Sequence, residues 1–282
     1  MLCNDELIYR VTALRLRCFH DESVKFPSDF LQRFINLIKL KVTCSSFTCI
    51  FSSGSECAGH SETTMKLRSL DLVKLANLEF ICEEKPEVQI FIQNIETLGV
   101  YRCSKLKNIV PSSVLFENLE QLEVAFCGGL EYILKSSTVA NLPKLWKLCV
   151  DGCEKIEEIV ASDDENDASV LCFMKLRYLR LNKLPKLRSF CKGRYGFKFP
   201  LLWTLFVIDC PMMEIFSHGV LNTSKLTEIR VGPGYESEWN GGINSTLGKI
   251  AAKKVMYTKS IISNHDPNVM SCILTLLLPF PV

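Results

Sequence analysis

Cysteine is the residue type with the most chemistry to offer in this sequence. The chain of 282 residues contains 14 cysteines, and Cys127 lies in the stretch LEQLEVAFCGGLEYI, residues 119–133, between hydrophobic residues and two glycines. A thiol there could act as a nucleophile, bind a metal or form a disulfide. A disulfide framework is typical of small secreted proteins, but this chain is long and its N-terminal sequence lacks the basic and apolar regions of a signal peptide. The sequence therefore predicts reduced thiols and a cytoplasmic protein.

Metal binding has weak support in the spacing of the possible ligands. The sequence contains no Cys-x-x-Cys pair, and its nearest approach to a zinc site is Cys57 and His60, with Cys44 and Cys49 upstream at irregular spacings. The acidic run at residues 163–167 lacks the glycine and glutamate spacing of an EF-hand calcium loop. We expect no metal site, and we interpret the acidic run as a solvated loop on the convex side of the fold.

Catalytic motifs have no better support. The four histidines have no recurring acidic or nucleophilic partner, and the sequence contains no Gly-x-Ser-x-Gly motif. The string nearest to a phosphate-binding loop, residues 242–250, has one residue too many and places Ile250 where the metal-binding hydroxyl belongs. These features predict a protein that is not an enzyme and needs no cofactor.

The elements that position Cys127 are repeats. The hydrophobic motif Leu-x-x-Leu-x-Val-x-x-Cys of residues 119–127, here called the beat, recurs on both sides of Cys127 at spacings of 24 to 31 residues. A second beat follows three and six residues on, at Leu130 and Ile133 in this unit. In two early units the cysteine, Cys18 or Cys44, comes one place early. Units start at residues 11, 37, 67, 95, 119, 145, 176, 202 and 226, which makes nine copies.

The two beats of each unit predict its structure. The change from period two to period three indicates a strand followed by a curved, 3₁₀-like return. A single unit cannot bury its own apolar face, so the copies must stack. The predicted fold is an α/β leucine-rich repeat solenoid, or horseshoe, of about nine repeats. A parallel sheet of short strands should line its concave face, with irregular or 3₁₀ return segments on its convex side.

The ninth position of the beat explains the cysteines. It lies where the chain leaves the strand and turns inward, so a small and weakly hydrogen-bonding residue fits there. Leu75 and Leu184 occupy it in two units, and leucine could not replace a catalytic thiol. We therefore interpret the cysteines at this position as structural: Cys103, Cys127, Cys153 and Cys210.

The charge balance and the apolar runs restrict the partners. Lys and Arg number 33 against 31 Asp and Glu, a net charge of +2 that favours neither nucleic acid nor an anionic membrane. The longest apolar run, at residues 273–282, is too short for a bilayer and contains two prolines. We expect a protein partner, no nucleic acid and no membrane span.

Several phrases narrow the kind of repeat. Leu142-Pro143 and Phe199-Pro200 precede the units that start at residues 145 and 202. The segments CEKIEEIV, LNKLPKLRSF and CPMMEIF stand in the later part of their units, and WNGGINSTL follows the last unit. With these phrases, residues 10 to about 250 resemble the C-terminal repeat domain of plant intracellular immune receptors of the coiled-coil, nucleotide-binding class. The resemblance implies a recognition and regulatory domain in plant innate immunity. Such a domain senses a pathogen effector or an effector-modified host protein, and holds a nucleotide-binding module inactive until then.

Two alternatives remain open at this point. Substrate adaptors of ubiquitin ligases of the F-box type also carry leucine-rich repeats with this cysteine. Their repeats usually open a helix with Thr-Asp after the Cys-x-x-Ile beat, whereas here Lys107-Asn108, Tyr132 and Glu157-Glu158 stand at that place and no F-box precedes the repeats. A non-functional receptor fragment is the other alternative, because the chain starts almost directly in a repeat.

The alternation of side chains along each strand predicts the binding surface. Residues between the buried ones project from the concave face, and aromatic and arginine residues in one patch resemble binding hot spots. For Trp146 and Trp203, packing between adjacent repeats at the rim of the sheet is the alternative to binding a partner. The predicted protein-binding residues are Tyr101, Glu123, Lys147, Asp151, Tyr178, Arg180, Asn182, Thr204, Phe206 and Ile208, with Trp146 and Trp203 beside the strand starts.

The end of the repeats predicts three regions: a solenoid at residues 1–243, a capping helix at 244–263 and a loosely ordered tail at 264–282. Ser245 is expected to cap the helix, which runs through Leu247. The helix should cover the open edge of the final strand, which otherwise exposes unpaired backbone and apolar side chains.

Overall fold

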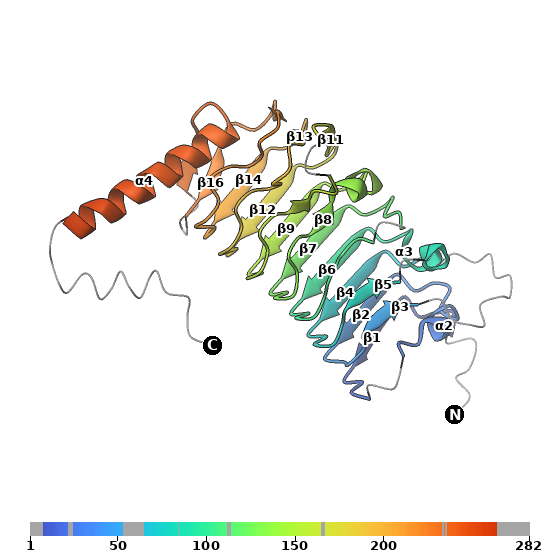
Figure 1. The fold of residues 1–282 in the computed structure, drawn as a ribbon. Helices are drawn as coiled ribbons and strands as arrows, with labels where there is room; N and C mark the ends of the chain where they lie inside the picture. Colours follow the sequence, from blue (N-terminus) through green and yellow to red (C-terminus); the bar gives the residue numbers. More distant parts are fainter. Residues whose placement is uncertain are drawn as a thin grey trace.

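A single sheet runs along the molecule, and one short strand of each repeat contributes to it (Figure 1). The computed structural model describes residues 8–21, 25–52, 65–83, 85–111, 114–164, 167–232, 234 and 236–263. In these residues the sheet has ten strands. In spatial order they are β1 (Ala13–Arg17), β2 (Lys39–Thr43), β4 (Ser69–Val73), β6 (Thr97–Tyr101), β7 (Gln121–Ala125), β9 (Lys147–Asp151), β12 (Tyr178–Asn182), β14 (Thr204–Ile208), β16 (Ile229–Val231) and β17 (Glu236–Glu238).

Neighbouring strands from β1 to β16 are parallel and pair without a slip in register. Leu122 is the register partner of Leu98 on one side and of Leu148 on the other. All three leucines are fully buried, so equivalent positions of successive units form continuous apolar columns inside the solenoid. The predicted leucine-rich repeat solenoid is confirmed.

A left-handed residue follows the strand in successive units. The N–H of this residue donates to the carbonyl of the last strand residue in the next unit, as Phe126 N does to Asp151 O at 2.9 Å. Cys18 and Cys44 occupy this turn position, and Ser45 takes the buried ninth place of its unit, which explains why these cysteines come one residue early. Non-glycine residues with this conformation are Cys18, Cys44, Lys74, Arg102, Phe126, Lys183 and Asp209, with φ between 49° and 61°.

The return segments contain more regular structure than the sequence indicated. Short helices are α2 (Ser28–Leu31), η1 (Pro86–Val88), α3 (Gln89–Ile92) and η2 (Ser136–Asn141), of which η1 and η2 are 3₁₀. Short parallel strands also pair there: β3 (Cys49–Phe51) with β5 (Phe80–Cys82), β8 (Leu134–Lys135) with β10 (Val160–Ala161), and β13 (Gly196–Lys198) with β11 (Val170–Cys172) and β15 (Leu221–Asn222). These strands hold the return side of adjacent units in register, as the main sheet does on the other side.

The core lies between the main sheet and the return segments. Toward the C-terminal end it contains a cluster of phenylalanines, in which Phe190 and Phe216 stack with ring centroids 4.5 Å apart at 8°. Phe197 and Phe199, also fully buried, meet Phe190 edge to face. Such aromatic pairs add to the free energy of burial.

The C-terminal cap differs from the expectation. The edge of β16 is covered by β17, which pairs with it antiparallel, and not by a helix. Helix α4 (Ile243–Ser263) projects away from the end of the solenoid (Figure 1). Its Ile243 and Leu247 are buried, whereas Met256 is 72% exposed, so the helix packs on the last repeat through its first turns.

The expected helix at residues 244–263 is present as α4, but Ser245 does not cap it. Ser245 lies inside α4, and its Oγ is within hydrogen-bond distance of the carbonyls of Asn240 (2.6 Å) and Gly242 (3.1 Å). Asn244 fastens the helix to the repeat before it. Its side-chain oxygen accepts the N–H of Phe216 at 2.8 Å, and its amide donates to the Ser217 carbonyl at 2.8 Å. The tail predicted at residues 264–282 lies outside the described residues.

Candidate protein-binding surface

The cysteines of the ninth position lie inside the solenoid. Cys103, Cys127 and Cys153 are fully buried and Cys210 is 5% exposed. Each thiol lies near the carbonyl two residues before it, as Cys127 Sγ does at 3.5 Å from Ala125 O. The N–H of Cys127 also donates to Cys153 Sγ at 3.4 Å, so one unit is linked to the next. Hydrogen bonding to Cys127, together with burial, raises the pKa of Cys103 and Cys153, which disfavours their reactive thiolates.

The candidate metal ligands do not form a site in the described part of the chain. No group of three or more His, Cys, Asp or Glu side chains there could hold a metal ion. Asp163 of the acidic run accepts hydrogen bonds from Ser136 Oγ and Ser137 N, each at 2.8 Å, and so helps to join two return segments. Cys57 and His60 lie outside the described residues, as does Glu165.

The solvent-facing side of the ten-stranded sheet, here called the sheet face, brings most of the predicted binding residues together. Three of them form a network across β6, β7 and β9. Tyr101 donates its hydroxyl to Glu123 at 2.8 Å, and Lys147 Nζ lies 2.6 Å from the other oxygen of that carboxylate. The hydrogen bond from Lys147 lowers the pKa of Glu123 despite partial burial, and Glu123 in turn raises the pKa of Lys147. The network therefore carries a fixed ion pair at neutral pH.

Aromatic and cationic side chains alternate on the next strands, β12 and β14. The rings of Tyr178 and Phe206 are 5.3 Å apart. Lys147 Nζ lies 6.0 Å from the Tyr178 ring centroid, and Arg180 Cζ lies 6.0 Å from that of Phe206. Such cation–π contacts hold long side chains in defined positions on a surface. The arrangement presents flat apolar rings framed by charges.

The two tryptophans differ in their exposure at the rim. Trp203, immediately before β14, is 59% exposed, and Lys225 Nζ lies 5.1 Å from its ring centroid. Trp146, immediately before β9, is half-buried. Trp203 is therefore available to a partner, whereas Trp146 offers less of its ring.

Two predicted surface residues at the ends of the strands are buried. Asn182 is 6% and Ile208 is 4% exposed. Asn182 turns toward the neighbouring strand and donates its amide to Asp151 Oδ2 at 2.5 Å, which removes both polar groups from full contact with solvent. Ile208 is the register partner of Asn182, in the same column of side chains. On β12 and β14, the half-buried residues of the sheet face are therefore the first and third of each strand: Tyr178, Arg180, Thr204 and Phe206.

Cys149 and Phe126, which lie beside these residues, were not predicted as binding residues. Cys149 is half-buried on β9, in register with Glu123 and Arg180, and burial raises its pKa to about 11. The alternation along β9 would have indicated it, because it lies between two residues that were selected. Phe126 is 50% exposed and lies just beyond β7, where the alternation of the strand no longer applies.

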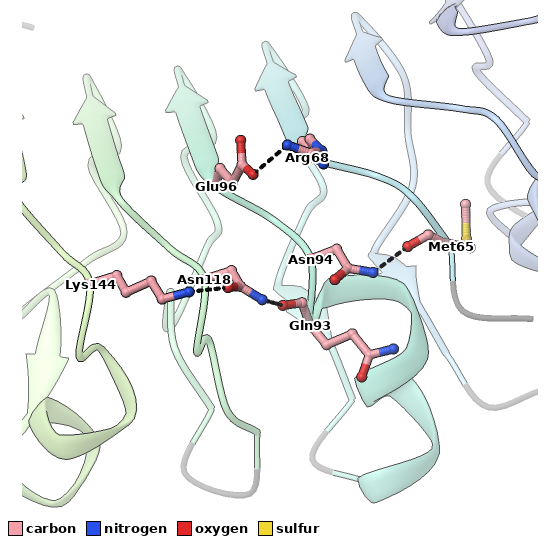
Figure 2. A network of polar contacts seen from close by, with 7 residues as sticks. All are labelled: Met65, Arg68, Gln93, Asn94, Glu96, Asn118 and Lys144. Atoms are coloured by element: carbon pink, nitrogen blue, oxygen red, sulfur yellow. Dashed lines mark hydrogen bonds and ion pairs between the residues drawn. The ribbon is translucent and has the colours of Figure 1, made fainter.

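A ladder of polar side chains along the strand starts was also not predicted (Figure 2). Asn94 Nδ2 donates to the Met65 carbonyl and Asn118 Nδ2 to the Gln93 carbonyl, both at 2.7 Å. Lys144 then donates to Asn118 Oδ1 at 2.6 Å. The signal was present in the sequence, since an asparagine precedes the first apolar residue of the beat in the units that begin at residues 37, 95 and 119. These hydrogen bonds link successive units at the starts of their strands.

Comparison with known proteins identifies the family. Residues 3–116 and 114–232 match the family described as plant disease resistance protein RPS2-like, leucine-rich repeats. The chain belongs to this family. Like the structure, the RPS2-like repeat match extends through the last of the parallel strands, β16.

Similar curated proteins carry names that agree with an RPS2-like repeat. Disease resistance protein UNI of Arabidopsis thaliana is 27% identical over 165 residues, which cover 58% of this chain and 18% of that protein. Probable disease resistance protein At1g61300 of the same plant is 23% identical over 262 residues, 84% of this chain and 32% of that protein. The chain thus spans about a fifth to a third of the length of these relatives. No solved structure shows a significant match.

The helices of these RPS2-like repeats were also compared with the requirements of a membrane span. No helix in the described residues combines the length and the apolar character that a membrane span requires.

Proposed function

We propose that this chain is a non-enzymatic protein-recognition domain in plant defence, and that its sheet face binds the partner. The observation that carries the proposal is the patch of Tyr178, Arg180 and Phe206 on adjacent strands, with the exposed Trp203 at its rim. Tryptophan, tyrosine and arginine dominate the residues that contribute most to protein binding. The disease resistance names of the relatives supply the plant-defence setting.

The rigidity of the surface supports recognition. Side chains on the sheet face are held by the strands beneath them and by contacts such as the Tyr101–Glu123–Lys147 network. A surface that is ordered before binding loses less conformational entropy when the partner docks. The sheet face also offers little for catalysis, because the thiol of Cys149 has its pKa raised to about 11 and is protonated at neutral pH.

The finer proposal names the partner classes. In the cytoplasm of a plant cell, the domain would bind a pathogen effector, a host protein that an effector has modified, or the nucleotide-binding module of a receptor. Binding to that module would hold the module inactive until an effector or an effector-modified host protein displaces it from the domain. The resemblance to immune receptors and the disease resistance names of the relatives support this assignment.

The proposal is tested by a triple variant of the sheet face. Tyr178, Arg180 and Phe206 are changed together to alanine, and binding is measured in a pairwise panel of pathogen effectors, their host targets and receptor nucleotide-binding modules. The variant should lose binding that the unchanged chain shows, because it removes the centre of the patch. Retained binding would refute the assignment of the surface.

A matched control removes similar apolar surface from outside the sheet face. Phe80 on β5 and Val220 before β15 lie on return segments and are 36% and 79% exposed, and Met174, in the turn that precedes β12, is 55% exposed. Their combined change to alanine should leave binding unchanged. The same panel should include ligase scaffold subunits, because binding to those alone would favour the ubiquitin-ligase adaptor instead.

A further inference from the structure

Phe126 occupies a backbone conformation that disfavours it. Its φ is 56°, in the left-handed region, where a bulky side chain is an outlier. Its ring is nevertheless 50% exposed and so is not kept there by burial in the core. The other described residues in this turn position are cysteine, lysine, arginine, aspartate or glycine. An exposed aromatic ring held in an unfavourable conformation is a feature that folding alone does not explain.

The neighbouring units provide a seat for this ring. A Cβ atom added at Gly152, the equivalent residue of the next unit, would lie 2.6 Å from the Phe126 ring. Gly152 thus allows the ring to lie directly over its backbone. On the other side, Arg102 Cζ of the preceding unit lies 5.4 Å from the ring centroid. The ring is therefore fixed between two adjacent turns.

Phe126 forms one wall of a hollow on the sheet face. The hollow has a volume of about 440 Å³, within the range of ligand pockets, and Tyr101, Cys149 and Tyr178 also line it. A similar feature shapes the wall formed by Tyr101, since a Cβ added at Gly99 would lie 2.7 Å from the Tyr101 ring. Two glycines thus leave room for two aromatic walls.

The four charged residues that line the hollow balance in sign, Glu123 and Asp151 against Lys147 and Arg180. Glu123 is bonded to Lys147 and to the Tyr101 hydroxyl, and Asp151 accepts the amide of Asn182. The Cys149 thiol at the hollow is neutral at physiological pH, because burial raises its pKa to about 11. The hollow therefore presents aromatic rings and a neutral thiol, and its four charged residues carry no net charge that an occupant would have to neutralise.

We propose that this hollow takes one large apolar side chain, such as leucine, methionine or phenylalanine, from the protein partner, and that Phe126 is a specificity-determining residue for it. The inference rests on the proposed function, because it assigns the chemistry of the partner at the same surface. A large apolar side chain buried among rings is the typical anchor of a protein interface.

The test is a selection of peptides from a random library displayed on phage, against the unchanged protein. The selected peptides should share a large apolar residue at one position. Synthetic copies should bind F126A and F126G at least tenfold more weakly, and should lose as much when their own apolar residue is changed to alanine. The two losses should not add when combined, because they remove the same contact. F126G also relieves the unfavourable backbone conformation, so its circular dichroism spectrum separates loss of binding from loss of folding.

The control variant is F80A. Phe80 is an exposed phenylalanine on the return side with a cation, Lys107 Nζ, at 5.2 Å from its ring centroid, which is the same local arrangement as Phe126 with Arg102. Peptide binding should be unchanged in F80A. Selected peptides without a common apolar residue, or with affinities for F126A within twofold of the unchanged protein, would overturn the inference.

The outcomes separate this inference from the proposed function. Peptides that depend on Tyr178, Arg180 and Phe206 but not on Phe126 would leave the binding surface in place and remove the apolar anchor. If no selected peptide depends on either set of residues, both the anchor and the sheet face as binding surface are refuted.

Discussion

Changing Cys127 to alanine tests whether the buried cysteines stabilise the stack of repeats. The side chain is fully buried, and its Sγ lies 3.5 Å from Ala125 O and 3.8 Å from Val100 O of the preceding unit. Removing one buried heavy atom costs about 0.5–1.5 kcal/mol in other cores. Loss of a hydrogen bond adds about 0.5–1.5 kcal/mol. We therefore expect the free energy of unfolding to fall by about 1–3 kcal/mol.

The assay is thermal and urea unfolding followed by circular dichroism in the presence of a reductant. For a chain of this size, each kcal/mol lowers Tm by about 2–4 °C, so the expected shift is about 2–12 °C. Cys172 is exposed, and its change to alanine is the matched control, expected to alter stability by no more than about 0.5 kcal/mol. Equal unfolding free energies for the two variants would refute the reasoning.

A serine at the same position distinguishes hydrogen bonding from volume. Ser45 occupies the equivalent place after β2, where it is 4% exposed. Its Oγ donates to the Thr43 carbonyl at 3.0 Å and accepts the N–H of Phe19 at 3.1 Å. Changing Cys127 to serine should therefore cost less stability than changing it to alanine. A larger loss with serine would show that apolar packing of the sulfur, and not its hydrogen bonds, accounts for the cysteine.

Three further outcomes follow from the contacts described above. The pKa of Glu123 is lowered by its lysine partner, so the ionised carboxylate stabilises the fold above the unfolded-state pKa and this stabilisation is lost as the pH falls through the folded-state pKa. Urea titrations should thus show stability falling more steeply between about pH 5 and pH 3 in the unchanged protein than in E123Q, and parallel curves would contradict this. Asn244→Ala should lower the free energy of unfolding by about 1–3 kcal/mol by leaving half-buried backbone groups unpaired, while Asn222→Ala, at an exposed site, serves as the control and should have little effect. A bulky maleimide should label the exposed Cys172 much faster than the buried Cys153 in the native state, and mass spectrometry of the two peptides would expose equal rates.

Much of the fold follows from the period of the sequence. In the units that start at residues 37 to 202, the leucine and valine positions of the beat are those that the structure buries, because a side chain that alternates along a short strand must face either solvent or the shared interior. The same rule places Tyr101, Glu123, Lys147 and Arg180 on the sheet face, where the structure brings them together. It fails at the ends of β12 and β14, where Asn182 and Ile208 are buried.

The structure of the C-terminal end could not be predicted from the repeat pattern. After β16 the period ends, and nothing local distinguishes a covering strand from a covering helix. The choice depends on pairing between β16 and β17, which satisfies backbone groups that α4 leaves aside. The asparagine ladder also depends on tertiary structure, because its donors and acceptors belong to residues 25 to 29 positions apart in the sequence.

By itself, the sequence determined the solenoid, its register and the burial of the ninth-position cysteines, because these depend on which residue recurs at which place in each unit. Only the tertiary structure decided that Phe126 lies over Gly152 and beside Arg102, and that Glu123 is shared by Tyr101 and Lys147. These contacts join side chains that the solenoid brings side by side from different units. Their geometry depends on the side chain present in each neighbouring turn, which a repeat averaged over nine units does not specify.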